Sequence, residues 1–82
     1  MNITKYASNS CVKCKVLDRT LKACSLPCEV TTLYVEDNEE LFKSKNIEQL
    51  PTLEITEDGK DPIYLTGVIS PKQINEAITS LN

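Results

Sequence analysis

Short blocks rich in β-branched and aromatic residues recur along the chain and predict four β-strands. Residues 3–6 form the first block, and residues 29–35 form a longer one with low helix propensity. Residues 52–56 alternate apolar and polar side chains, and the turn signal Asp58-Gly59 leads from them to residues 61–66. The last two blocks are therefore predicted to form a β-hairpin.

Three further segments have the periodicity and end signals of α-helices. The first follows Ser10, which we expect to be its N-cap, and ends before Pro27. Its apolar stripe consists of Val12, Leu17, Leu21 and Cys24. The second covers residues 39–45, where the charge changes from acidic to basic and so suits the helix dipole. The third opens with Ser70-Pro71, an N-cap followed by a proline at the first helical position.

The predicted order of elements is β-α-β-α-β-β-α, which indicates an α/β fold. The 82 residues leave room for one small domain over residues 1–82. Because a helix between the first two strands makes a right-handed crossover, these strands should be parallel. We expect a four-stranded mixed sheet with an antiparallel final hairpin and helices on both faces.

Composition and charge narrow the classes of function. The chain is 40% hydrophobic and 26% charged, as in an ordinary globular protein, and its net charge of -3 argues against nucleic-acid binding. No stretch approaches the ~20 apolar residues of a membrane span, and the first residues lack the apolar core of a secretory signal. A cytosolic location without a membrane partner is the expectation.

Four cysteines and no histidine restrict the chemistry to thiols and carboxylates. Cysteine–histidine nucleophile pairs and zinc sites with imidazole ligands are excluded by the composition. Cytosolic thiols are kept reduced, so persistent structural disulfides are rare in that compartment. Catalysis, metal binding and apolar packing remain as uses for these cysteines.

The motif Cys11-Val12-Lys13-Cys14 stands between the first strand and the helix that follows it, a context typical of redox chemistry. With Ser10 as the cap, Cys11 takes the first helical position, where free N–H groups and the positive dipole end stabilise a thiolate. We therefore predict Cys11 as the nucleophile. Cys14 lies on the same helical face, close enough to act as the resolving thiol. Exposed charges on Lys13 and Lys15 should contribute less than the backbone donors.

A four-cysteine zinc site is the alternative use of the motif, with Cys24 and Cys28 completing it. Against this site, a helical spacer places Cys24 about 15 Å along the helix from Cys14. Packing in the core is the favoured role of Cys24, a Cys24–Cys28 disulfide is conceivable, and neither residue is assigned to catalysis.

Three motifs in this order resemble the glutaredoxin branch of the thioredoxin superfamily over essentially the whole chain, and most of all the NrdH-redoxin family. They are Cys11-Val12-Lys13-Cys14, Gln49-Leu50-Pro51, and Gly67 before the helix that begins Ser70-Pro71. The resemblance implies a thioredoxin-like fold and a cis Leu50–Pro51 bond against the active-site disulfide. It also implies that Val12, Lys13, Leu50, Pro51 and Gly67 contact the substrate, with the Leu50 main chain pairing with an extended strand. The residues alone leave Pro51 open as the start of a strand and Gly67 as a turn residue.

The sequence departs from the glutaredoxin pattern at the residues that hold glutathione, which bears on the source of electrons. Classical glutaredoxins have proline after the first active-site cysteine, a basic residue before it, and Gly-Gly with a nearby Asp in the last loop. Here Val12, Ser8 and Gly67-Val68-Ile69-Ser70 stand in these places, so we expect poor glutathione binding. The typical NrdH-redoxin sequence Trp-Ser-Gly-Phe-Arg-Pro is also altered, since residues 65–71 are one residue longer and lack aromatics.

The resemblance thus implies a monomeric, cytoplasmic protein disulfide oxidoreductase without a tightly bound cofactor, whose electrons reside in the Cys11–Cys14 pair. A flavoprotein disulfide reductase or glutathione would supply the electrons. A disulfide-bearing protein such as ribonucleotide reductase would accept them. A glutathione-dependent glutaredoxin and a metal-binding or scaffold module are the competing interpretations.

Overall fold

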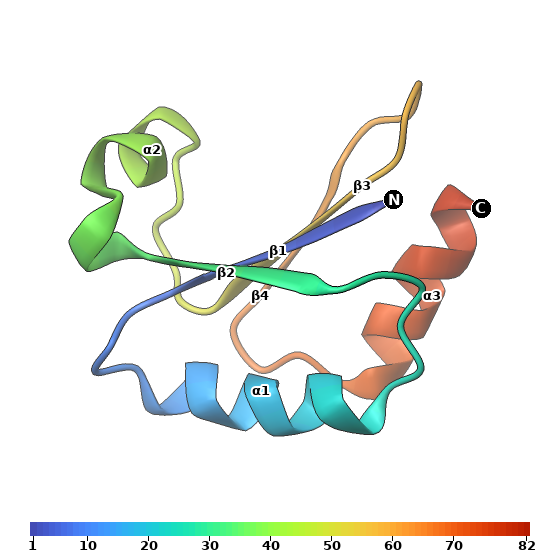
Figure 1. Ribbon diagram of the computed structural model, residues 1–82, viewed down its shortest axis with the longest axis horizontal. Helices are drawn as coiled ribbons and strands as arrows, with labels where there is room; N and C mark the ends of the chain where they lie inside the picture. Colours follow the sequence, from blue (N-terminus) through green and yellow to red (C-terminus); the bar gives the residue numbers. More distant parts are fainter.

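A four-stranded mixed sheet in the order β2-β1-β3-β4 forms the centre of the computed structural model, which describes residues 1–82 (Figure 1). The strands are β1 (Asn2–Ala7), β2 (Val30–Tyr34), β3 (Thr52–Thr56) and β4 (Ile63–Thr66). β1 is parallel to β2 and antiparallel to β3, and β3 and β4 form the antiparallel hairpin. The predicted sheet is confirmed.

Three α-helices flank this sheet: α1 (Val12–Ala23), α2 (Glu39–Ser44) and α3 (Pro71–Leu81). A short 3-10 helix, η1 (Val35–Asp37), connects β2 to α2. Figure 1 shows α1 and α3 on one side of the sheet and α2 on the other, as the predicted arrangement requires. None of these helices has the length and apolar character that a membrane span requires.

The main core lies between the sheet and the pair α1 and α3. Alternation along the strands directs Ile3, Leu53 and Ile55 to this side, where each is at most 1% exposed. The helices contribute Leu17, Leu21, Ile74, Ala77 and Leu81. Because burial of each large aliphatic side chain is worth about 1.5–3 kcal/mol, this cluster holds α1 against the sheet.

The element ends differ slightly from prediction, for local reasons. β2 stops at Tyr34 because Val35 enters η1, and β4 begins at Ile63 because Pro62 has no N–H for the ladder. At the other end of the hairpin, Gly59 takes a φ of 76° in the predicted turn.

The start of α3 confirms Ser70 as the N-cap with Pro71 after it, and adds a capping box with Gln73. The Ser70 hydroxyl accepts a hydrogen bond from the Gln73 amide at 3.2 Å, and the Gln73 side chain accepts one from the Ser70 amide at 2.9 Å. Pro71 occupies the first turn. This capping box satisfies two otherwise free donors at the helix start.

The α2 side of the sheet is organised by one carboxylate, Glu54. It accepts hydrogen bonds from the Tyr6 and Tyr64 hydroxyls at 2.8 and 2.6 Å and from the Lys45 ammonium at 2.9 Å. The Tyr6 ring also meets Phe42 of α2 edge-on, at 5.2 Å between centroids. Burial alone would raise the pKa of Glu54, but the bonds from Tyr64, Lys45 and Tyr6 outweigh it and lower that pKa. Glu54 therefore joins β1, β3, β4 and the end of α2.

Replacing Glu54 with glutamine should lower the free energy of unfolding by about 2 kcal/mol at neutral pH, because charged hydrogen bonds are lost. The folded pKa lies below the unfolded value near 4.3, so this stabilisation is complete above that value. It is lost as the pH falls through the folded pKa. Urea unfolding from neutral to acid pH should show the wild type and Glu54→Gln converging. Glu40→Gln, a change at an exposed carboxylate, is the control; a Glu54→Gln difference independent of pH would contradict this account.

Candidate active site

Cys11 is the N-cap of α1, and its sulfur is the capping atom. Its backbone is extended, with φ -89° and ψ 110°, and its Sγ accepts a hydrogen bond from the Cys14 amide at 3.1 Å. The expectation that Ser10 caps the helix and that Cys11 is its first residue is wrong by one position. The sulfur itself takes the acceptor role that a serine hydroxyl usually fills. The Cys11 sulfur consequently lies at the positive end of the helix dipole and accepts a hydrogen bond from a backbone amide that has no partner within the helix.

Cys11 and Cys14 are joined by a disulfide, with their Cα atoms 5.3 Å apart. The two sulfurs differ in environment: Cys14 is buried, at 3% exposure, whereas Cys11 is only half-buried. An incoming molecule can therefore approach Cys11 more readily than Cys14.

The loop that leads from β1 to Cys11 is held by a residue that the sequence did not single out, Glu36 of η1. Its carboxylate accepts hydrogen bonds from the Ser8 hydroxyl at 2.8 Å and from the Asn9 amide at 3.2 Å. The Ser8 carbonyl oxygen in turn accepts a hydrogen bond from the Cys11 amide at 3.3 Å. Hydrogen bonds from its own backbone amide, from Ser8 and from Asn9 lower the pKa of Glu36. The carboxylate thus stays ionised and holds the loop.

The Leu50–Pro51 peptide bond is cis, and Pro51 is buried while Leu50 is half-buried. The Gly67 amide donates to the Pro51 carbonyl oxygen at 3.1 Å, and Gly67 has a φ of 76°, which favours glycine. The strand register places Tyr6 opposite Thr52, and Thr52 opposite Thr66. The end of β1, the start of β3 and the end of β4 therefore meet at one edge of the sheet, beside the start of α1 (Figure 1).

Exposed apolar side chains surround this edge. Val12 is 73% exposed in the motif itself, and Val68, after Gly67, is 78% exposed. Val16 follows Val12 by one helical turn and is also exposed, and Lys13 points to solvent. Coverage of such apolar side chains by a partner lowers the free energy, because apolar surface is removed from water.

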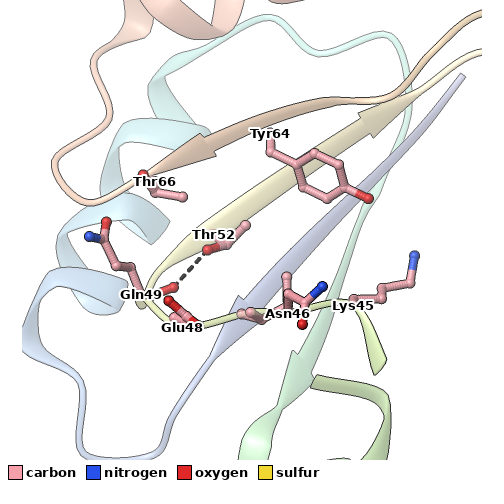
Figure 2. Close-up of a pocket in the computed structure, with 8 residues that line it drawn as sticks. Lys45, Asn46, Glu48, Gln49, Thr52, Tyr64 and Thr66 are labelled. Carbon is pink, nitrogen blue, oxygen red and sulfur yellow. Dashed lines mark hydrogen bonds between the residues drawn. The ribbon is translucent and has the colours of Figure 1, made fainter. Parts of the chain in front are cut away.

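Two hollows lie on opposite sides of the sheet. A cleft of about 150 Å³ on the α1 side is bordered by Cys11, Cys14 and the ion pair of Lys5 and Asp18. A larger hollow of about 420 Å³ lies on the other side and contains no thiol (Figure 2). Its lining residues are Lys45, Asn46, Ile47, Glu48, Gln49, Thr52, Tyr64 and Thr66. In Figure 2 the Thr52 hydroxyl donates to the Gln49 carbonyl oxygen, at 2.6 Å, and this bond steadies the segment before Pro51.

Cys24 and Cys28 are free, half-buried and packed against the main core. Cys24 ends α1 as its C-cap, at the far end of the helix from Cys11. No group of three or more potential ligand side chains is arranged to hold a metal ion.

Known proteins place this arrangement in a family. The sequence profile described as Thioredoxin matches residues 1–80. A comparison with curated protein sequences gives no match. Among solved structures, chloroplastic thioredoxin z is 25% identical with a TM-score of 0.81, over 96% of this chain and 75% of that one.

Two bacterial proteins are similar as well. Desulfothioredoxin from Desulfovibrio vulgaris Hildenborough is 26% identical with a TM-score of 0.78, over 96% of this chain and 79% of that one. The glutaredoxin-like NrdH-redoxin from Escherichia coli is 25% identical with a TM-score of 0.66, over 93% of each chain. The predicted thioredoxin-like fold is confirmed by these matches. With the profile spanning nearly its whole length and a Cys11–Cys14 disulfide at the start of α1, the chain belongs to the thioredoxin family of redox proteins.

Proposed function

We propose that this chain reduces disulfide bonds in a partner protein as a glutaredoxin-like redoxin of the NrdH type. The observation that carries the proposal is the position of the Cys11 sulfur at the N-terminus of α1, where it accepts a hydrogen bond from the Cys14 amide. Such a position favours the thiolate, the form of cysteine that attacks disulfides. Membership in the thioredoxin family supports thiol–disulfide oxidoreductase chemistry.

The reaction proceeds in two exchanges. The Cys11 thiolate attacks one sulfur of the partner disulfide, forms a mixed disulfide and releases the other partner sulfur, which takes up a proton. Deprotonated Cys14 then attacks the Cys11 sulfur, breaks the mixed disulfide and releases the second partner thiol. The partner gains two electrons, and the chain is left with the Cys11–Cys14 disulfide.

The partner binds as an extended segment along the loop before β3. Leu50 makes no backbone hydrogen bond within the chain, so its amide and carbonyl are available to pair with such a segment. Gly67 has no side chain to obstruct the approaching backbone, and Val12 and Val68 offer apolar contacts on either side. Lys13, within the cysteine motif, adds an exposed positive charge.

No tightly bound cofactor is required, because the electrons are carried by the cysteine pair. A flavoprotein disulfide reductase regenerates the dithiol, and a disulfide-bearing enzyme such as ribonucleotide reductase is the proposed acceptor. The solved structure of the NrdH-redoxin from Escherichia coli is described as explaining a thioredoxin-like activity profile in a glutaredoxin-like protein. We further propose that residues 1–82 act as one domain, as a cytoplasmic monomer.

Substitution of each active-site cysteine should separate the two roles. Cys11→Ser should reduce the rate of insulin disulfide reduction to background, because the attacking thiolate is gone. Cys14→Ser should stop at the mixed disulfide, which can be isolated by non-reducing electrophoresis and identified by mass spectrometry. Trapping through Cys14 in the Cys11→Ser variant would reverse the assignment.

The double variant Cys24→Ala/Cys28→Ala should keep insulin reduction within about twofold of the wild type, because Cys24 is at the opposite end of α1 from Cys11 and Cys28 precedes the start of β2. The thermal unfolding midpoints of the variant and the wild type are compared, to check that the variant is folded. Metal analysis of anaerobically purified wild-type protein tests the competing module. Stoichiometric zinc together with no insulin reduction would favour a metal-binding or scaffold role.

The electron source is expected to be thioredoxin reductase rather than glutathione. Ser8 occupies the position where glutaredoxins carry a basic residue, and its hydroxyl donates a hydrogen bond to the Glu36 carboxylate. The negative charge of Glu36 therefore lies where the carboxylates of glutathione would need a cation. With NADPH, thioredoxin reductase should reduce the oxidised protein faster than glutathione with glutathione reductase. Efficient turnover in the glutathione system alone would instead favour a glutathione-dependent glutaredoxin.

A further inference from the structure

Lys5 is a charged residue in a position that an apolar side chain would normally fill. It lies on β1 between Ile3 and Ala7, faces α1, and is 2% exposed. Its ammonium forms an ion pair with Asp18 of α1, whose side chain is half exposed. Lysine is almost never fully buried, and the desolvation of its ammonium is costly.

The buried ammonium borders the same cleft as the active-site disulfide. Lys5, Asp18, Cys11 and Cys14 all line this cleft of about 150 Å³. Cys14 and Asp18 are one helical turn apart on α1, so their side chains share the face that is turned toward β1. Lys5 and Cys14 are therefore two buried residues that border one cleft, whereas Cys11 is the more exposed member of the pair.

Stability alone does not account for this lysine. A methionine or leucine could pack against α1 without the cost of burying a charge, and replacement of a buried ion pair by apolar side chains is often neutral or stabilising. The hydrogen bond to Asp18 also uses only part of the donor capacity of the ammonium. The remaining donors can act on a charge that forms in the cleft.

We propose that Lys5 lowers the pKa of Cys14 in the reduced protein and so prepares the resolving thiol for attack. Cys14 is buried, and burial in apolar surroundings disfavours its thiolate. A nearby ammonium offsets this effect, because opposite charges at short range attract strongly where water is scarce. The proton of Cys14 leaves to solvent on the open side, and the thiolate then attacks the Cys11 sulfur of the mixed disulfide. Lys5 is thus a positioning residue, and its proposed role rests on the redox function proposed above.

The other charged and titratable groups around the cleft act more weakly or in the opposite sense. Lys15 is exposed on α1, where solvent screens it, and Tyr34 contributes a hydroxyl from β2. The Asp18 carboxylate opposes a thiolate but is half exposed and engaged with Lys5. No titratable residue of β3 or β4 lines the cleft.

The test measures Cys14 alone, in a Cys11→Ser/Cys24→Ala/Cys28→Ala parent in which it is the only thiol. The rate of alkylation by iodoacetamide is followed from acid to alkaline pH. Lys5→Met should move the midpoint of this profile upward by about one pH unit, so that alkylation near neutral pH slows about tenfold. Lys15→Met removes an exposed cation from the same cleft and should move the midpoint much less. Equal midpoints in the parent and the Lys5→Met variant would overturn the proposal.

Asp18→Asn provides the second arm, because it leaves the ammonium without its counter-ion. The Cys14 midpoint should then move downward, opposite to the effect of Lys5→Met. A role confined to packing cannot produce shifts of opposite sign, so movement of both midpoints in one direction would also refute the proposal. Insulin reduction by the same substitutions in the otherwise unmodified chain tests the proposed function separately. In that assay Lys5→Met should slow turnover at neutral pH and recover toward alkaline pH.

Discussion

The hydrogen bond from the Cys14 amide to the Cys11 sulfur is the contact on which the active end of this protein depends. It starts α1, because the sulfur satisfies a backbone donor that would otherwise be free. It also points the sulfur along the helix dipole, which favours negative charge at that atom. One four-residue segment therefore begins a helix and places a cysteine sulfur where negative charge is favoured.

That segment is held in place by elements far from it in the chain. Glu36 of η1 binds the loop before Cys11, and the aliphatic cluster between α1 and the sheet fixes the direction of the helix. The register of the strands then brings the cis Leu50–Pro51 bond and Gly67 to the same edge. At this edge the Leu50 backbone has no hydrogen-bond partner within the chain, which is why the proposed substrate strand is assigned to it.

The buried charged groups on the two faces of the sheet differ in how many partners they have. On the α2 side Glu54 gathers two tyrosine hydroxyls and one ammonium, so that its charge is fully compensated and the strands are joined. On the α1 side the core is apolar except for Lys5, whose single carboxylate partner reaches solvent. A fully bonded polar network adds rigidity, whereas Lys5 keeps unused donors beside the cleft, which is the basis of its proposed effect on Cys14.

The order of elements, the hairpin turn at Asp58-Gly59, the capped start of α3 and the place of the cysteine motif before α1 can all be predicted from the amino-acid sequence. These features depend on periodicity, turn chemistry and caps within a few residues, and such signals are local. Even the error at Ser10 was a matter of one position, since a cysteine sulfur replaced a serine hydroxyl as the capping atom. Only the folded chain brings Glu36 to Ser8, Tyr6 and Tyr64 to Glu54, and Lys5 to the cleft that Cys14 borders. These residues belong to different strands, helices and loops, and they come together only once the sheet register and helix packing have positioned those elements.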